Sequence, residues 1–255
     1  MAKIITRLSG RLGNNLFQIS TAYSLAKKYN RKLVVFSDNK EYFNSIFKDL
    51  DHTNIINFTH GSFTEPNNLF AKCIKININN NNTVIYGYFQ NEKYFIDCRD
   101  ELIKLFTDNA IYKSIDNIYT NSYFIHVRRG DYINNSYHYI NLDNYYKKAI
   151  NYIESKTQNP HFYIISDDIE YCKKYTIFDN INKSFVNNNT IETLYILSMC
   201  SLGGICGNST FAWWGAWLNT NNNKIVIFPN KWLNCGPETD TSDIYFKGSV
   251  VIDIT

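Results

Sequence analysis

The chain has 255 residues, of which 44% are hydrophobic and 16% aromatic, so it can bury one large core or two smaller ones and is not a disordered polypeptide. Lysine and arginine number 26 against 23 aspartates and glutamates, which gives a formal charge of +3. That balance argues against nucleic-acid binding through an overall basic surface, so a site for an anion would have to be local.

The cysteines and the apolar runs exclude further classes of protein. None of the six cysteines belongs to a C-x-x-C pair, so neither a zinc ribbon nor a thioredoxin-like motif is expected. No apolar run reaches the roughly 18 residues of a membrane-spanning helix, and the opening MAKIITRLSG lacks the apolar core of a signal peptide. We therefore expect a cytosolic protein with reduced thiols and no transmembrane segment.

Strand and helix patterns alternate from the start of the chain. KIITRL (3–8) is rich in β-branched residues and predicts a strand, and SGRLGNN (9–15) predicts a glycine-containing turn. Apolar residues at helical spacing predict a helix over 16–29, and KLVVF (32–36) predicts the next strand. The chain therefore opens as a β-α-β unit, which favours a parallel sheet.

The middle of the chain carries a predicted break. TVIYGYFQ (83–90) predicts a strand and residues 93–106 a helix, after which the sequence turns polar. We place a domain boundary within this polar stretch and divide the chain into residues 1–115 and 116–255.

The second half repeats the alternation more clearly. Strands are expected at residues 123–127, 161–165, 202–207 and 224–229, the last clear strand. Helices are expected at residues 142–154, from 166 onward as a short one, at 190–200 behind an Asn189 cap, and at 211–219. The predicted fold is α/β, with two doubly wound, Rossmann-like halves facing each other.

Unusual polar clusters follow four of the predicted strands. They lie in SGRLGNNLFQ (9–18), YFIHVRRGDY (123–132), IISDD (164–168) and GGICGNSTFAWWGAWL (203–218). Ligands of an open parallel sheet bind beyond the carboxyl ends of its strands, so these clusters are candidates for one site.

The paired arginines suggest a site for an anion. Because successive side chains of a strand point to opposite faces, Arg128 and Arg129 should have different tasks. One should bind the anion, and the other should brace the site, with Asp131 as its partner. The planar, permanently charged guanidinium suits a diphosphate. The alternative is a pair of surface arginines with a capping aspartate.

Each of the other clusters has a functional and a structural interpretation. Ser209 or Thr210 should cap a helix whose N-terminal N–H groups suit phosphate, although a plain N-cap explains the same residues. Trp213, Trp214 and Trp217 on this helix are expected in the core. The SDD carboxylates could accept hydrogen bonds from ribose or guanine, hold a metal, or provide an N-cap through Ser166 or Asp167. Gly10 and Gly13 frame a turn that matches neither a dinucleotide fingerprint nor a P-loop.

Together the clusters resemble the bacterial α-1,2-fucosyltransferases of glycosyltransferase family 11. HVRRGDY is similar to the family's arginine motif and YIISDDIEYCK to its second motif, with Tyr171 where many members have Trp. GNSTFAWWGAWL resembles the third motif, with Thr210 and Ala212 in place of serines, and GRLGNNLFQ the amino-terminal one, with Asn15 where Gln is common. GYFQNEKYF (87–95) fits a further segment, so the resemblance spans nearly the whole chain in order.

The resemblance implies a GT-B-like fold, GDP-fucose as a substrate, and no cofactor or obligatory metal. It places Arg128 on the β-phosphate, His126 and Asp168 near the guanosine, and Ser209 and Thr210 near the diphosphate. Asn14 would lie near the fucose and the acceptor hydroxyl. Further expected donor-binding residues are Arg11, Gly13, Arg129, Asp167, Asn208 and Phe211.

The implied chemistry is inverting transfer of L-fucose from GDP-β-L-fucose to the 2-hydroxyl of a terminal galactose. Arg128 and the 209–211 amides would stabilise the leaving GDP. Asp131 is a candidate general base, although it could instead orient Arg129. Residues 1–115 would serve the acceptor and residues 116–255 the donor.

A β-galactoside glycan is the expected acceptor, and nucleic acid is not an expected partner. The expected location is the cytoplasm, with peripheral association with the inner membrane as an option. The alternatives are a non-catalytic carbohydrate-binding protein and a glycosyltransferase with another nucleotide-sugar donor.

Overall fold

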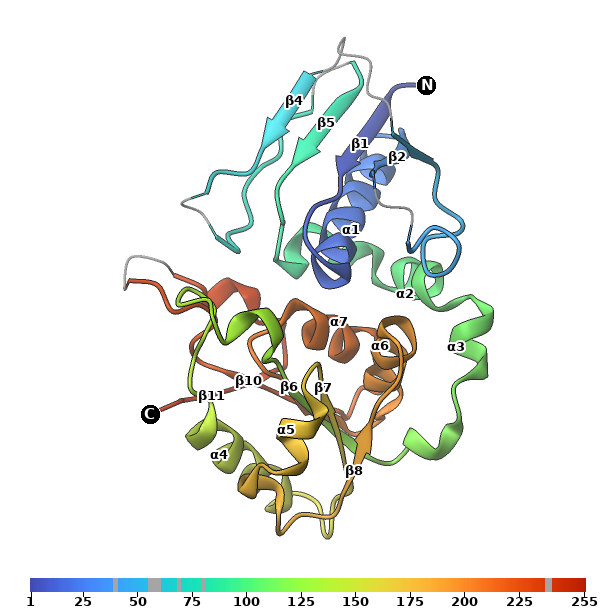
Figure 1. Cartoon of the computed structure of the whole chain (residues 1–255). Coiled ribbons are helices and arrows are strands. Elements are labelled where there is room, and N and C mark those ends of the chain that lie inside the picture. Colours follow the sequence, from blue (N-terminus) through green and yellow to red (C-terminus); the bar gives the residue numbers. More distant parts are fainter. Residues whose placement is uncertain (39–40, 55–60, 68–69, 79–80, 237–239) are drawn as a thin grey trace. The chain divides into compact units, whose positions relative to one another are not determined.

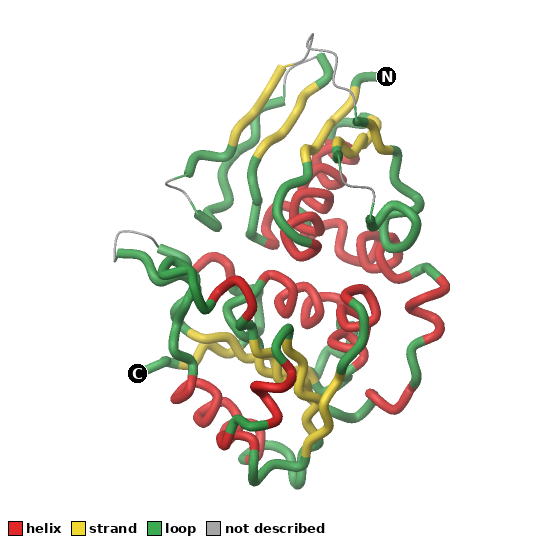
Figure 2. Tube along the Cα trace, in the orientation of Figure 1, coloured by secondary structure: helices red, strands yellow, loops and turns green. Residues whose placement is uncertain are grey.

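The computed structural model describes residues 1–38, 41–54, 61–67, 70–78, 81–236 and 240–255 (Figure 1). These residues form two compact units. Unit 1 consists of Met1–Lys113 with Ser242–Ile244, and unit 2 of Ser114–Thr241 with Tyr245–Thr255. Each unit is a parallel sheet with helices packed against it (Figure 2), so the α/β class is confirmed.

Unit 1 contains a five-stranded sheet in the order β3-β2-β1-β5-β4, and all pairings are parallel. Its strands are β1 (Lys3–Arg7), β2 (Lys32–Phe36), β3 (His52–Thr53), β4 (Gly61–Thr64) and β5 (Thr83–Tyr86). Its helices are α1 (Leu12–Lys28), α2 (Arg99–Thr107) and α3 (Ala110–Ser114), the last of which ends at the break between the units.

Three expectations for unit 1 are corrected by the structure. The first helix begins at Leu12 rather than Leu16, because Asn15 turns inward and donates to the Ser9 carbonyl at 3.0 Å instead of staying in solvent. The strand expected over residues 83–90 is β5, and it ends at Tyr86. Gly87 and Phe89 adopt positive φ angles of 154° and 50°, which end the strand. The helix expected over 93–106 is two 3₁₀ turns followed by α2.

Unit 2 contains a six-stranded parallel sheet in the order β11-β10-β9-β6-β7-β8. Its strands are β6 (Tyr123–Val127), β7 (Phe162–Ser166), β8 (Lys183–Val186), β9 (Gly203–Ile205), β10 (Ile225–Pro229) and β11 (Val250–Ile252). Its helices are α4 (Asp143–Glu154), α5 (Ile169–Lys173), α6 (Thr190–Met199) and α7 (Thr210–Leu218). The expected strands and helices of this half are all present, and Asn189 caps α6 as predicted.

Four strands were not predicted: β3, β4, β8 and β11. Each lies at or next to a sheet edge and has only two to four residues, so it lacks an apolar run long enough to be recognised. Val251 in β11 is 45% exposed, for example, although it is in the middle of a strand.

Helix α7 of unit 2 is buried along most of its length. Trp213, Trp214 and Trp217 are at most 2% exposed, which confirms their predicted place in the core. Gly215 allows α6 to approach, because a Cβ at this position would lie 2.3 Å from the Cβ of Leu197. Truncating a buried Trp to Ala typically costs about 3–5 kcal/mol, so α7 is firmly anchored.

The strand order gives each sheet a topological switch point. In unit 2 the chain runs from β6 outward to β7 and β8, and then from β9 outward to β10 and β11, so β6 and β9 are adjacent strands with diverging successors. In unit 1 the corresponding pair is β1 and β5. Crevices at such points, beyond the carboxyl ends of the strands, are where open α/β sheets bind ligands.

No helix in the described part of the chain has both the length and the apolar character that crossing a bilayer requires.

Candidate active site

The carboxyl end of β6 separates the two arginines, as the alternation of a strand predicts. His126 lies on the same side as Arg128, and its ring centroid is 5.9 Å from that of Phe211 in the first turn of α7. Val127, between them, joins the apolar cluster that contains α4. Arg128 is therefore directed toward α7, whereas Arg129 is directed toward α5.

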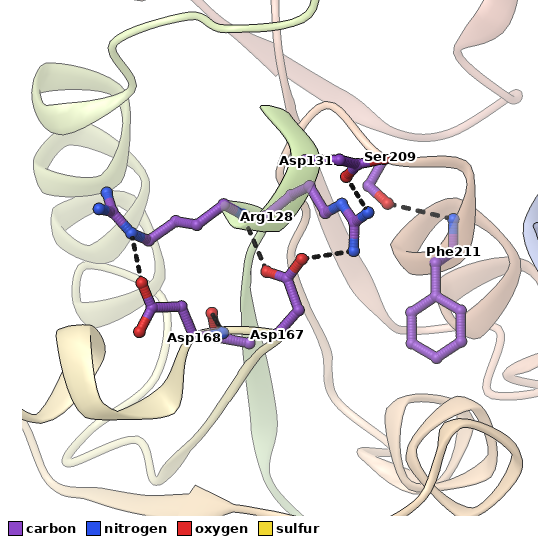
Figure 3. A network of polar contacts seen from close by, with 8 residues as sticks. Arg128, Asp131, Asp167, Asp168, Ser209 and Phe211 are labelled. Atoms are coloured by element: carbon purple, nitrogen blue, oxygen red, sulfur yellow. Dashed lines mark hydrogen bonds and ion pairs between the residues drawn. The ribbon is translucent and has the colours of Figure 1, made fainter. Parts of the chain in front are cut away.

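Arg128 is held between two carboxylates (Figure 3). Its Nη1 lies 2.5 Å from Oδ2 of Asp167, and its Nη2 donates to Oδ1 of Asp131. The guanidinium carbon is 5.1 Å from the ring centroid of Tyr132, close enough for a cation–π contact. Only 13% of this side chain is exposed, so its charge is well defined in position.

Arg129 is held by a different set of groups. Its Nε donates to Oδ2 of Asp168 at 3.1 Å, and its guanidinium carbon is 3.3 Å from the ring centroid of Tyr171. Arg129 therefore braces the strand end, but Asp131 is not its partner as expected. The 3₁₀ turn Gly130–Tyr132 folds Asp131 back onto Arg128, three residues earlier.

The SDD segment after β7 connects both arginines. Asp167 accepts from the backbone N–H of Arg129 through Oδ1 at 2.9 Å while its other oxygen pairs with Arg128. A Cβ at Gly130 would lie 2.3 Å from that second oxygen, so a larger residue there would push the Asp167 carboxylate out of its present place. The sequence Arg-Arg-Gly and the first aspartate of SDD thus form one packed unit.

The second aspartate of SDD is the N-cap of α5. Asp168 accepts from the backbone N–H of Tyr171 at 3.2 Å, and its own N–H donates to Ser166. The expected caps, Ser166 and Asp167, are wrong by one or two residues because the helix begins only at Ile169. In the part of the chain that the structure describes, no group of three or more His, Cys, Asp or Glu side chains is arranged to hold a metal ion.

The third cluster forms the turn from β9 into α7. Ser209 caps the helix as predicted, since its Oγ accepts from the backbone N–H of Phe211 at 3.3 Å. Thr210 and Phe211 are partly exposed in the first turn. The side-chain amide of Asn208 donates to the carbonyls of His138 and Trp232 at 3.0 Å each, so its hydrogens hold two loops together.

His126 is a buried and neutral histidine. It is 4% exposed, and its Nδ1 has no hydrogen-bond partner among the described residues. Burial, and then the positive charge of Arg128, lower the pKa of His126 to about 3. The imidazole therefore adds no charge to the site at neutral pH.

The switch point of unit 1 is lined by amides. Oδ1 of Asn14 accepts from Nε2 of Gln90 at 2.9 Å, which joins the turns after β1 and β5. Gly10 has a φ of 74°, and a Cβ there would lie 2.4 Å from Nδ2 of Asn14. Arg11 is the exposed N-cap residue of α1, and Gly13 is buried in its first turn.

Two features of these sites were not predicted from the sequence. Gln90 was overlooked although GYFQNEKYF was recognised, and its place after a predicted strand was the available signal. The second feature is a solvent-open hollow of about 480 Å³ in unit 2, beside both arginines. Its walls include Tyr132, Tyr139, Tyr171 and Tyr175. Tyrosine spacing alone does not distinguish such walls from the core.

Comparisons with known proteins identify the family of the chain. The family model of Glycosyl transferase family 11 matches residues 2–252. The chain is 33% identical to the α-1,2-colitosyltransferase of Escherichia coli over 272 residues, covering 91% of this chain and 93% of that protein. It is 30% identical to the O-antigen biosynthesis glycosyltransferase WbnK of Escherichia coli, covering 89% and 93%.

Among solved structures, the fucosyltransferase NodZ from Bradyrhizobium matches with a TM-score of 0.53 at 14% identity, covering 84% of this chain and 92% of that chain. A NodZ structure co-crystallized with GDP gives a TM-score of 0.52 at the same identity, covering 84% and 91%. These likenesses support the predicted GT-B fold. Because the family model spans almost the entire chain, the protein belongs to glycosyl transferase family 11 and is a glycosyltransferase.

Proposed function

We propose that the protein is an inverting fucosyltransferase that moves L-fucose from GDP-β-L-fucose to the 2-hydroxyl of a terminal galactose, forming an α-1,2 linkage. The observation that carries the proposal is the position of Arg128 and of the N-terminus of α7, which follow the adjacent strands β6 and β9. Both flank the switch point between β6 and β9, and both favour negative charge. A nucleoside diphosphate matches that combination.

The chemistry follows from where charge develops. As the bond from the fucosyl carbon to the β-phosphate breaks, GDP gains negative charge. Arg128 and the N–H groups at the start of α7, capped by Ser209, are placed to stabilise that charge. In this proposal they do the work that a divalent cation does in many transferases, so no metal is required.

The acceptor side of the proposal rests on unit 1. The amides of Asn14 and Gln90 are neutral, and one hydrogen bond fixes both at the switch point. Neutral amides are poor bases but good at orienting a hydroxyl, so we assign them the positioning of the acceptor. Asp131 is the assigned proton acceptor, because it is an exposed carboxylate next to Arg128.

The donor sugar has one specific competitor. The relative at 33% identity is named for colitose, which is L-fucose without its 3-hydroxyl. A NodZ structure, with a TM-score of 0.50, was soaked with GDP-fucose. GDP-colitose is therefore the second candidate donor, and a cytoplasmic location with peripheral membrane association stays a prediction.

The test is to incubate the purified protein with lactose and either GDP-fucose or GDP-colitose, and to assign the product linkage by NMR. We expect α-1,2-fucosyllactose from GDP-fucose and slower transfer from GDP-colitose. Faster transfer of colitose than of fucose would make GDP-colitose the assigned donor. A 1→3 or 1→6 bond in the product would contradict the proposed α-1,2 linkage. Glycan binding without any GDP release would support the non-catalytic alternative instead.

A further inference from the structure

The ion-pair network around Arg128 has an excess of negative charge. Two guanidinium groups, those of Arg128 and Arg129, meet three carboxylates. His126 adds no positive charge because burial lowers its pKa to about 3. While Asp131 and Asp167 both stay paired with Arg128, their charges oppose an approaching diphosphate, and Nη2 and Nη1 each already contact a carboxylate oxygen. A phosphate oxygen that binds Nη1 or Nη2 therefore competes with the carboxylate on that nitrogen, and replacing one carboxylate also removes the excess negative charge.

The two carboxylates on Arg128 differ in how firmly they are held. Asp167 has a second anchor, the backbone N–H of Arg129 at 2.9 Å, and it packs against Gly130. Only 26% of its side chain is exposed. Asp131 lies on a 3₁₀ turn of three residues, and 52% of its side chain is exposed (Figure 3). Asp131 is thus the more exposed of the two carboxylates on Arg128, which makes it the better candidate for replacement by a phosphate.

We propose that the donor's β-phosphate replaces Asp131 on Nη2 of Arg128, while Asp167 keeps its place on Nη1. This inference rests on the function proposed above. In the empty enzyme Asp131 occupies the phosphate position and holds the guanidinium in the orientation the donor needs. Binding of the donor releases the Asp131 carboxylate next to the reacting centre.

The released carboxylate then accepts the proton of the acceptor hydroxyl. The acceptor oxygen forms a bond to the fucosyl carbon, the bond from that carbon to the β-phosphate oxygen breaks, and its electron pair leaves with GDP. The proton ends on an Asp131 oxygen and passes to water when GDP departs. The base is therefore free only when the donor is bound, which couples donor binding to activation of the acceptor.

The exchange predicts that the two carboxylates have opposite effects on GDP affinity. Asp131→Asn removes a competitor, so GDP should bind about tenfold more tightly. Asp167→Asn loosens Arg128 and the Arg129 backbone, so GDP should bind more weakly. Turnover of Asp131→Asn with GDP-fucose should fall by roughly 100-fold or more despite the tighter binding. Asp131→Ala should likewise bind GDP more tightly and turn over GDP-fucose more slowly.

The measurement is titration calorimetry of full-length wild-type and variant proteins with GDP, and with GMP as a ligand that lacks the β-phosphate. GMP affinity should be unchanged in Asp131→Asn. Asp179→Asn is the matched control, because it removes an exposed aspartate that precedes β8 at the amino end of the sheet. Thermal melting of each variant checks that it is folded.

Four results would overturn the exchange. Tighter GDP binding in both variants would mean that only overall charge matters, and weaker binding in both would make Asp131 a positioning residue. Turnover of Asp131→Asn close to that of the wild type would remove its role as base. A wild-type protein that binds no GDP would instead overturn the proposed donor itself, and the exchange with it.

Discussion

The two units share one plan but differ in the polar groups at their switch points. In unit 2 the turns after β6 and β7 carry arginines and aspartates joined by ion pairs. In unit 1 the turns after β1 and β5 carry amides and a hydroxyl, which bond to one another and to the backbone. The same topology has thus been fitted with charge in one unit and with neutral groups in the other.

From this difference we infer that topology sets the place of each site and that the side chains there set its ligand. Charge-assisted hydrogen bonds are about twice as strong as neutral ones, so the unit 2 turns suit a diphosphate. The exceptions in unit 1 include Arg11 in the turn after β1, and Glu65, which accepts from the backbone N–H groups of Tyr88 and Phe89 at 2.7 and 2.9 Å. Burial raises the pKa of Glu65, and its Oε2 accepts both hydrogen bonds from the loop after β5.

The largest expected effect comes from keeping the positive charge of Arg128 while removing its planar, two-pronged guanidinium. Arg128→Lys should lose about 3 kcal/mol of transition-state stabilisation, or roughly 100-fold in rate, because lysine cannot hold two partners in one plane. Initial rates of fucosyl transfer measure the effect. Arg31→Lys in unit 1 is the control and should change little. A rate for Arg128→Lys within about threefold of the parent would remove Arg128 from the mechanism.

The amide site of unit 1 is tested by Asn14→Ala. Loss of its bond with Gln90 should disturb acceptor positioning and reduce transfer by roughly 10- to 100-fold. Acceptor KM and kcat should change while GDP affinity stays the same, because we assign Asn14 to the acceptor and not to GDP. If turnover and acceptor KM are both unaltered, Asn14 has no part in acceptor binding.

Asp168→Ala should weaken GDP binding about tenfold and slow turnover less, because it removes the partner of Arg129. Asp168→Asn is the informative companion, since asparagine still caps α5 but no longer pairs with Arg129. Calorimetry with GDP should show similar losses for both variants. Normal affinity in Asp168→Asn, or in folded Asp168→Ala, would limit Asp168 to the helix cap.

A smaller effect concerns pH and stability. The pKa of His126 is about 3 in the folded protein against 6.5 in the unfolded chain, so only the unfolded chain gains a proton as pH falls below 6.5. This group therefore contributes its full stability above pH 6.5 and loses it progressively toward pH 3. His126→Gln should remove that loss, a difference in slope of up to about 1.4 kcal/mol per pH unit.

Urea unfolding at several pH values measures this slope. All four tryptophans, at positions 213, 214, 217 and 232, are in unit 2 with His126. Their fluorescence therefore reports the unfolding of the unit that contains this histidine. Parallel stability curves for wild type and His126→Gln would show that the histidine is not the acid-labile group.

The sequence predicted unit 2 better than unit 1 for a physical reason. The central strands β6 and β7 are buried apolar runs, and the Ser209 and Asn189 caps precede clear helical patterns. In α1 the inward-facing polar residues Asn15 and Gln18 hid the first turn. Edge strands such as β11 are too short and too exposed to give a periodic signal.

The ion pairs among the residues of the candidate site were not predicted from the sequence. Alternation along β6 correctly separated Arg128 from Arg129, because it depends only on local geometry. The exchange of partners, Asp131 with Arg128 and Asp168 with Arg129, depends on a 3₁₀ turn and on where α5 begins. Those features are set by packing between distant segments, as is the contact of Asn14 with Gln90.

The central claim is that the charged turns of unit 2 replace a metal in stabilising the leaving GDP. The most direct measurement is the initial rate of fucosyl transfer to lactose in excess EDTA, compared with the rate in added Mg²⁺ or Mn²⁺. We predict the same rate in all three conditions, because Arg128 and the start of α7 supply the positive potential. Loss of transfer in EDTA, with recovery on adding either cation, would contradict the account and make SDD a metal site.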